Sequence, residues 1–238
     1  MSTAVVSSTG QSLTYWHDGI ECCDAVWESA YAQFETPEEE IAKFIRRFRQ
    51  LGVDRWPKSM QIAELFCGRG NGLVALDRLG FSNLHGADLA PSLLRQYSGH
   101  AKLFVADCRN LRFEDRSLDA VIIQGGLHHL PDVEPDLPLV LNEIKRILRP
   151  GGKVVVVEPW LTPFLRVVHF LARRSLVRRV STKFHALQQM IMREQTTYDS
   201  WLRQPDKILT MIESRFVTER LIVRTGKLMF VGSNSAPE

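Results

Sequence analysis

A cluster of glycines follows a short apolar segment in the second quarter of the chain. Residues 61–66 are typical of a buried strand, and Gly68, Gly70 and Gly72 follow it directly. Glycines after a strand let the backbone approach a ligand closely and turn into a helix, whose first amide groups can hold an anion. The spacing does not match the dinucleotide fingerprint, because a third glycine counted from Gly68 would fall on Leu73. The loop therefore predicts a ligand of another kind.

Three acidic residues accompany three neighbouring predicted strands. Glu64 lies in the first strand, Asp88 ends the second strand 24 residues later, and Asp107 follows the third. The carboxyl ends of neighbouring parallel strands face one crevice, where Asp88 can accept ribose hydroxyls and Asp107 an adenine amine. Three carboxylates would repel a pyrophosphate. They suit a ligand that carries an ammonium group, a sulfonium and a ribose.

The elements that must position these residues alternate along the chain. The sequence predicts strands at about 61–66, 84–88, 102–106, 118–124 and 153–158, and helices near 71–80, 91–98 and 133–148. Strands separated by helices pair in parallel through right-handed crossovers, which predicts a doubly wound α/β sheet. Residues 218–225 and 227–232, with Gly226 between them, indicate two further strands joined by a tight turn.

Two segments lie outside this alternation. Residues 1–14 are expected to form a disordered tail, and residues 15–238 a single domain. The domain begins with helices, one of them marked by Thr36 as its cap. Residues 160–215 are expected to form a helical insertion between strands five and six, and no acid occurs between positions 159 and 193.

Six motifs follow one another within about 100 residues. They are Glu64-x-x-Cys67-Gly68-Arg69-Gly70, Gly86-Ala87-Asp88-Leu89, Ala106-Asp107, Ser117-Leu118-Asp119-Ala120-Val121-Ile122, Leu127-His128-His129-Leu130, and Ile147-Leu148-Arg149-Pro150-Gly151-Gly152. With these motifs, residues 61–158 resemble the class I S-adenosylmethionine (SAM)-dependent methyltransferases, in particular their broad small-molecule branch.

The resemblance implies a Rossmann-like, seven-stranded and mainly parallel sheet, whose sixth strand and antiparallel seventh strand come from residues 218–232. It implies SAM as the cofactor and S-adenosylhomocysteine as its product. The implied cofactor residues are Glu64, Gly68 and Gln124 at the methionine part, Asp88 with its neighbour Leu89 at the ribose, Asp107 and Cys108 at the adenine, and Gly70 in the glycine loop. One position departs from the family pattern, because Phe66 replaces a usual glycine near the methionine pocket.

The candidates for acceptor chemistry follow strand four. His128 and His129 lie where the transferred methyl group would point, and histidine titrates in the range useful for a general base. The alternative is that one histidine packs in the core and the other closes the loop. Glu158 is a second candidate base, with a buried structural acid as its alternative. Acceptor contacts are further predicted at Tyr31, Glu158, Arg173 and Tyr198.

Several acceptor classes lack their required residues. None of the four cysteines follows a proline, as a cytosine-5 methyltransferase of DNA would need, and none occurs after Cys108, as a uracil-5 methyltransferase of RNA would need. The segment Gln124-Gly125-Gly126-Leu127 is not the Asn/Asp-Pro-Pro-aromatic string of amino-methylating DNA enzymes. A small-molecule acceptor is therefore expected, with DNA excluded and RNA disfavoured. An RNA or protein methyltransferase and a non-catalytic SAM-fold subunit remain the alternatives.

The composition sets further limits. A net charge of +3 over 238 residues does not call for a polyanionic partner, and the cysteines show no paired metal-ligand spacing. No apolar run approaches the roughly 18 residues of a membrane span, so a soluble, cytoplasmic protein without a bound metal is expected. The basic insertion is interpreted as a mobile lid, a solvated face or an RNA-binding arm. Its arginines do not gather on one side of a helical wheel, which disfavours a membrane-surface helix. The oligomeric state is left open, with a homodimer among the alternatives.

Overall fold

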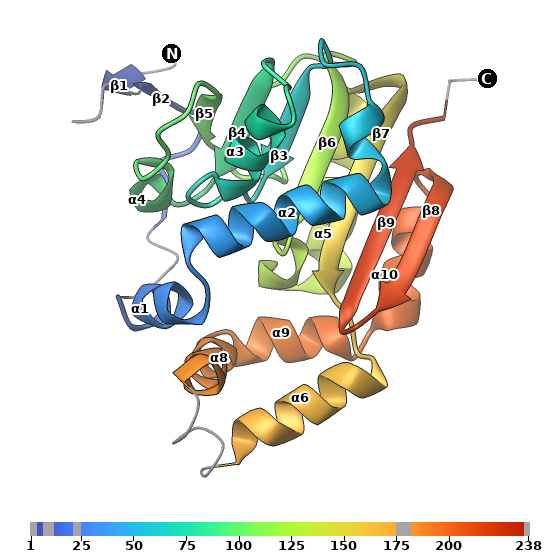
Figure 1. Cartoon of the computed structure of the whole chain (residues 1–238). Helices are drawn as coiled ribbons and strands as arrows, with labels where there is room; N and C mark the ends of the chain where they lie inside the picture. Colours follow the sequence, from blue (N-terminus) through green and yellow to red (C-terminus); the bar gives the residue numbers. More distant parts are fainter. Residues whose placement is uncertain (1–3, 7–11, 21–24, 175–181, 236–238) are drawn as a thin grey trace.

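A single mixed sheet forms the centre of the molecule. The computed structural model describes residues 4–6, 12–20, 25–174 and 182–235, and the arrangement of its elements is shown in Figure 1. The described strands in spatial order are β1 (Ala4–Val6), β2 (Ser12–Tyr15), β5 (Lys102–Val105), β4 (Leu84–Asp88), β3 (Ile62–Leu65), β6 (Leu118–Gln124), β7 (Leu148–Pro159), β9 (Lys227–Ser233) and β8 (Val217–Arg224).

The strand pairing confirms the predicted fold class. The pairs β5–β4, β4–β3, β3–β6 and β6–β7 are parallel, and β9 runs antiparallel to both β7 and β8. Glu64 pairs with Gly86 on one side and with Ile122 on the other, so β3 lies in the middle of the sheet. The chain order reverses at β3, and in such a sheet ligands bind at the carboxyl ends of the strands on either side of the reversal.

The amino-terminal edge corrects the sequence prediction. The sheet extends beyond seven strands, because β2 pairs in parallel with β5 and β1 pairs antiparallel with β2. Residues 4–6 and 12–14 are therefore not disordered, and the remainder of the predicted tail lies outside the described residues. The physical reason is that β5 offers an open edge of backbone hydrogen-bonding groups, and Leu13 becomes buried against Leu103 when it pairs there.

Helices cover both faces of the sheet. They are α1 (Ala25–Phe34), α2 (Pro37–Leu51), α3 (Asn71–Arg78), α4 (Pro91–Leu94), α5 (Val133–Ile147), α6 (Pro163–Arg173), α8 (Thr182–Arg193), α9 (Gln195–Leu202) and α10 (Pro205–Glu213), with single 3-10 turns η1 (Val53–Arg55) and η2 (Leu127–His129). The helix expected near 91–98 ends at Leu94. The insertion between β7 and β8 is helical, as predicted. Among the described residues, no helix is both long and apolar enough to cross a bilayer.

Alternation along the strands produces two apolar cores. In β6, Ala120 and Ile122 pack with residues of α2 and α3, whereas Val121 and Ile123 pack with residues of α5, α9 and α10. Figure 1 shows α2 crossing the sheet, while α1, α6, α8 and α9 gather beyond the end toward which β7 points. The carboxyl ends of the parallel strands, where the predicted site residues lie, are therefore covered by the amino-terminal helices and the insertion.

Helix α2 begins with a capping box. The Thr36 hydroxyl accepts a hydrogen bond from the Glu39 amide at 3.3 Å, and the Glu39 carboxylate accepts one from the Thr36 amide at 2.9 Å. Since both bonds satisfy groups that the helix itself leaves open, we expect Thr36→Ala to lower the free energy of unfolding by about 1 kcal/mol. Chemical denaturation measures this. Thr210→Ala is the control, because that hydroxyl only bonds back to the Asp206 carbonyl on the exposed surface of α10. Equal losses in the two variants would contradict the capping role.

Candidate active site

The glycine loop after β3 has the backbone that its residue types predict. Gly68 and Gly70 adopt φ angles of 52° and 77°, in the left-handed region that favours glycine. A Cβ atom at Gly70 would lie 2.4 Å from the Tyr97 ring, and one at Gly72 would lie 1.8 Å from Oε1 of Glu64. The loop therefore passes against Tyr97 and Glu64 so closely that side chains at these two glycines cannot be accommodated.

Buried polar atoms without hydrogen-bond partners lie at the position predicted for the methionine part of the cofactor. Glu64 is buried in the middle of the sheet and Gln124 lies beside it at the end of β6. Within the described part of the chain, Oε2 of Glu64 and both terminal side-chain atoms of Gln124 have no hydrogen-bond partner. Such atoms are costly to bury unless a ligand satisfies them. A carboxylate and an amide at this position fit the ammonium and carboxylate groups of a bound amino acid.

Asp88 holds the glycine loop in place from the end of β4. Its Oδ2 accepts a hydrogen bond from the Gly68 amide at 2.7 Å, and its Oδ1 accepts one from the Ala90 amide at 2.9 Å. Burial raises the pKa of this carboxyl group. Each carboxylate oxygen can accept a second hydrogen bond, so the group can also bind a pair of ribose hydroxyls. These contacts fit the predicted role of Asp88 at the ribose, which stays a prediction.

Asp107 is already engaged by a neighbouring arginine. The Arg109 guanidinium contacts both carboxylate oxygens at 2.7–3.1 Å, and the Arg109 amide donates to Oδ1 at 2.9 Å. Although burial acts to raise it, the hydrogen bonds from Arg109 lower the pKa of Asp107. Cys108 is buried beside it, and burial raises the pKa of its thiol. An adenine amine would have to share Asp107 with Arg109, so the adenine roles of Asp107 and Cys108 stay predictions.

The segment that precedes the first helix runs along the same edge. The amides of Trp16 and His17 donate to the Val105 carbonyl, and the Ile20 amide donates to the carbonyl of Leu89. Residues 16–20 therefore cross the carboxyl ends of β5 and β4, next to the positions predicted for adenine and ribose. The available signal was aromatic density, with Tyr15 and Trp16 directly after the predicted tail.

Phe66 adopts the backbone of the glycine that it replaces. Its φ angle is 55°, in the left-handed region that costs a residue with a Cβ about 1 kcal/mol or more. Its ring occupies the space over Gly126, where a Cβ atom would lie 2.3 Å from Cγ of Phe66. Gly126, in the neighbouring loop, has no side chain and so leaves room for the Phe66 ring. This packing accommodates the departure from the family pattern.

A histidine and a glutamate form a buried pair beyond β6. Glu158 is completely buried at the end of β7, and its Oε1 accepts hydrogen bonds from the Gly126 and Leu127 amides, each at 2.8 Å. Its Oε2 lies 2.8 Å from Nδ1 of His128. Since an ionised carboxylate only accepts, Nδ1 carries the hydrogen and Nε2 is the unprotonated nitrogen of the neutral ring. Glu158 therefore orients His128, and the role of His128 as a general base stays a prediction.

The insertion contributes the other wall of this cluster. Glu194 approaches Nε2 of His128 at 3.9 Å and Nδ1 of His129 at 3.6 Å. The Tyr198 ring meets the His128 ring edge to face at 5.7 Å, and the Tyr198 hydroxyl lies 3.2 Å from Nε2 of His169. The His129 side chain keeps 38% of its surface exposed. Burial and the neighbouring His128 lower the pKa of His129.

These groups include a set that can hold a cation. One ligand atom from each of His128, His129 and Glu194 lies within 4.8 Å of the others. Two imidazoles and a carboxylate suit a divalent metal ion, and Glu158 behind His128 matches the usual outer partner of such a ligand. No metal was expected from the sequence. The same atoms fit a general base and its neighbours equally well.

Tyr31 lies at the glycine loop. Its hydroxyl donates to Glu40, and the Arg69 guanidinium stacks over its ring at 4.4 Å. Glu40 also accepts a hydrogen bond from the Asn71 side chain at 2.8 Å, so α1 and α2 both hold the loop. Tyr31 was predicted as an acceptor contact, and that role stays a prediction. The side chain of Arg173, at the end of α6, lies outside the described residues.

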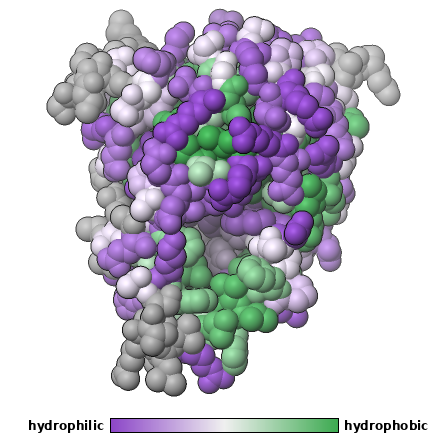
Figure 2. Space-filling view, in the orientation of Figure 1, coloured by the Kyte–Doolittle hydropathy of each residue, from purple (hydrophilic) through white to green (hydrophobic). Residues whose placement is uncertain are grey.

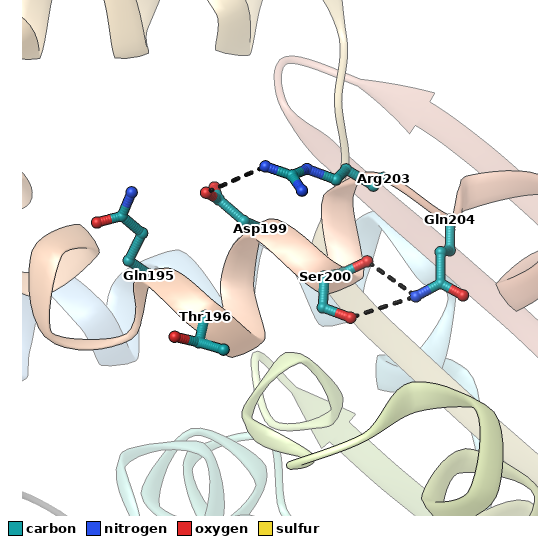
Figure 3. A pocket seen from close by; sticks show the side chains of 6 residues that line it. All are labelled: Gln195, Thr196, Asp199, Ser200, Arg203 and Gln204. Carbon is teal, nitrogen blue, oxygen red and sulfur yellow. Dashed lines mark hydrogen bonds and ion pairs between the residues drawn. The ribbon is translucent and has the colours of Figure 1, made fainter.

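A polar depression lies on α9, on the side of the helix opposite Tyr198. Figure 3 shows Asp199 paired with Arg203 at 3.8 Å and Gln204 donating to the backbone and hydroxyl oxygens of Ser200 at 3.2 Å. The opposite side of α9 carries Tyr198 and Trp201, which face the core. Two pairs of its polar residues bond to each other, unlike the buried atoms of Glu64 and Gln124, which have no partner within the described residues.

Burial of Glu64 makes a pH dependence expected. Burial raises the pKa of this carboxyl group from 4.5 to about 8, so the free protein holds a proton there at neutral pH. A ligand ammonium binds the ionised carboxylate, so the proton must leave Glu64 when the cofactor binds. Below pH 8, affinity for the cofactor should therefore rise about tenfold for each unit by which the pH is raised. Folding depends on pH in the opposite direction. The free energy of unfolding should fall as pH rises from 4.5 to 8, because the folded state holds the extra proton.

Calorimetric titration with SAM in two buffers measures the proton released when the cofactor binds. Glu64→Gln should abolish it, and unchanged release in that variant would contradict the assignment.

Comparison with known proteins places this site in a family. A family model described as a methyltransferase domain matches residues 63–156. A demethylmenaquinone methyltransferase of Clavibacter sepedonicus is 30% identical over 195 residues, which cover 74% of this chain and 76% of that protein. Another, from Staphylococcus aureus, is 33% identical over 121 residues, and the chain spans only 47% of its length.

Solved structures share the fold. A protein of Pyrococcus horikoshii superposes with a TM-score of 0.66 at 18% identity, covering 90% of this chain and 100% of that one. A SAM-dependent methyltransferase of Methanosarcina mazei superposes with a TM-score of 0.52 at 17% identity, covering 79% and 98%. The chain therefore belongs to the class I SAM-dependent methyltransferases. Its cofactor is S-adenosylmethionine, as the glycine loop and the strand-end acids predicted.

Proposed function

We propose that this enzyme methylates a hydroquinone, the reduced form of a quinone such as demethylmenaquinone, with His128 as the general base. The observation that carries the proposal is the buried pair in which Glu158 fixes the Nδ1 hydrogen of His128 at 2.8 Å and leaves Nε2 unprotonated. The Clavibacter sepedonicus relative is a demethylmenaquinone methyltransferase, which supports this acceptor class.

The chain's own groups explain why a hydroquinone suits this site. When bound, SAM supplies a methyl group on a positively charged sulfur, ready for displacement by an electron-rich atom. A phenolic ring becomes electron-rich when its hydroxyl loses a proton, and Nε2 of His128 can take that proton. The Glu158 side chain, which also accepts hydrogen bonds from two backbone amides, lies against this imidazole and stabilises the charge that the ring gains.

The remaining roles are binding and exclusion of water. Glu64 and Gln124 hold the amino-acid end of the cofactor, and Asp88 holds the ribose. Tyr198 closes the cluster from α9 with its ring against His128, and its burial beside the histidine removes water from the base. Positioning and water exclusion supply much of the rate in a displacement of this kind. Net transfer releases one proton from the acceptor, which leaves through His128.

A panel of acceptors tests the proposal. The protein is incubated with SAM and a short-chain 1,4-dihydroxynaphthalene, the corresponding quinone, or RNA, and the products are weighed by mass spectrometry. We expect a gain of one methyl group on the hydroquinone and none on the quinone, because only the hydroquinone has a proton for His128 to remove. Methylation of RNA but not of the hydroquinone would overturn the acceptor class.

Chelation separates the base from a metal-assisted reaction. His128, His129 and Glu194 can also hold a divalent ion, which would activate the acceptor hydroxyl in place of a free base. The hydroquinone assay is therefore repeated after dialysis against EDTA. Retained activity supports the base role of His128. Activity that is lost on chelation and restored by one divalent metal would overturn that role.

A further inference from the structure

Helix α6 presents an apolar face that no described element covers. Phe164, Val167 and Phe170 keep 54%, 55% and 54% of their surface exposed. They recur every three residues, so they lie on one side of the helix. In Figure 2 the corresponding patch is seen at the bottom of the molecule, where Figure 1 places α6. Monomeric proteins rarely leave such a row of large apolar side chains in water without a use for it.

The opposite side of the same helix is anchored to the enzyme. Ala172 is fully buried, and Leu165 packs close to Gly226 in the turn between β8 and β9. His169 lies 3.2 Å from the Tyr198 hydroxyl, and the Tyr198 ring contacts His128. Two side chains therefore connect the anchored side of α6 to the proposed base. The exposed face is fixed in orientation next to the active site, which distinguishes it from a loosely attached helix.

Charge indicates what covers this face. Arg166 and Arg174 are exposed on α6 and at its end, and the Arg174 guanidinium stacks over the Phe170 ring at 4.3 Å. No acidic residue occurs between positions 159 and 193, while that stretch contains Arg166, Arg173, Arg174, Arg178, Arg179, Lys183 and Arg193. An apolar row within an acid-free basic segment is complementary to a surface with apolar depth and negative headgroups.

We propose that α6 binds the surface of an anionic phospholipid membrane, with Phe164, Val167 and Phe170 among the acyl chains and Arg166 and Arg174 at the headgroups. This inference rests on the proposed function, since it assigns the hydroquinone an apolar tail that stays in the membrane while the ring enters the crevice. The helical wheel of the whole insertion disfavours a membrane-surface helix, whereas the proposed surface is α6 by itself. The arginines do not segregate over residues 160–193, but α6 alone carries a continuous apolar face.

Vesicle flotation tests the surface without cofactor or acceptor. The full chain is mixed with phosphatidylcholine vesicles, with or without an equal share of phosphatidylglycerol. We expect binding to the anionic vesicles and at least tenfold less to the neutral ones. Phe164→Ser/Phe170→Ser should lose at least tenfold in binding to the anionic vesicles. Arg166→Glu/Arg174→Glu should lose about fivefold or more per arginine and most of the preference for negative charge.

A matched control uses exposed apolar residues elsewhere. Leu139 on α5 and Val217 at the start of β8 are 49% and 56% exposed, and Val217 pairs at the end of the sheet remote from α6. Leu139→Ser/Val217→Ser should bind vesicles as the parent does. Equal loss in this control, or no binding of the parent to anionic vesicles at low salt, would overturn the proposal. A parent that is dimeric by light scattering, becomes monomeric in Phe164→Ser/Phe170→Ser and ignores vesicles would show that a second copy covers the face.

Activity assays separate this inference from the proposed function. With a short-chain hydroquinone in solution, Phe164→Ser/Phe170→Ser should keep the parent's rate, because both side chains lie on the exposed face of α6. With a long-chain hydroquinone in anionic vesicles, the same variant should lose at least tenfold. Equal rates on the vesicle acceptor would overturn the membrane role. Methylation of neither hydroquinone would overturn the proposed function, and the flotation result would still decide the membrane surface.

Discussion

Replacement of His128 should lower the maximal rate of methyl transfer by about 10²–10⁴ while the affinity for SAM is kept. The physical reason is that His128 offers the unprotonated Nε2 beyond β6, in an orientation fixed by Glu158 at 2.8 Å. His128→Ala also removes the hydrogen-bond donor to a completely buried carboxylate and should destabilise the protein. His128→Asn is the sharper variant, because its amide nitrogen can still donate to Glu158 and has no base at the Nε2 position.

The controls for this prediction lie in the same cluster. His129→Asn should cost less than tenfold, since Glu194 lies 3.6 Å from Nδ1 of His129, farther than the 2.8 Å at which Glu158 orients His128. Glu158→Gln should lower the rate as well, through the lost orientation and charge. Steady-state rates on the hydroquinone measure the losses in all of these variants. A loss under tenfold in His128→Asn would leave positioning alone as the source of the rate.

Asp88→Ala should weaken the binding of SAM by about 1.5–3 kcal/mol, because charge-assisted hydrogen bonds to the ribose are lost. The same change removes the carboxylate that receives the Gly68 amide at 2.7 Å, so the glycine loop loses support as well. Calorimetric titration with SAM measures the loss. Asp88→Asn should fall between parent and Asp88→Ala, since its amide oxygen still accepts.

An exposed acid on the neighbouring helix supplies the control. Asp77 lies at the surface of α3, and Asp77→Ala should leave the affinity for SAM unchanged. An affinity in Asp88→Ala equal to that of the parent would remove Asp88 from the ribose site. Thermal melts of all three variants separate lost binding from lost folding.

The core of the fold could be predicted because its signals are local. Apolar runs such as Val154–Val157, glycines after β3 and the Thr36 capping box each state their structure within a few residues. The edge strands could not be predicted from the sequence, because the four residues of β2 acquire their conformation only by pairing with β5. The left-handed backbone of Phe66 was equally hidden, because the glycine that accommodates its ring lies 60 residues away at Gly126.

The site shows the same division. Strand-end acids could be located from the sequence, because a parallel sheet brings its carboxyl ends to one edge. The side chains that pair with those acids could not be located from the sequence. His128 and Glu158 were proposed as separate candidates for the base, and only the pairing of β6 with β7 makes them one unit. The engagement of Asp107 by Arg109, and the approach of Glu194 to both histidines, depend on side-chain packing that no spacing rule predicts.

A single-turnover reaction with methyl-labelled SAM tests the central claim most directly. Enzyme in excess over the labelled cofactor is mixed with a short-chain 1,4-dihydroxynaphthalene, and S-adenosylhomocysteine and methylated product are measured together over time. The account predicts that both appear at one rate and in equal amounts, and that His128→Asn slows both alike. Stoichiometric cofactor binding with no label on the hydroquinone would contradict the proposed acceptor. Failure of the parent protein to bind SAM would contradict the account as a whole.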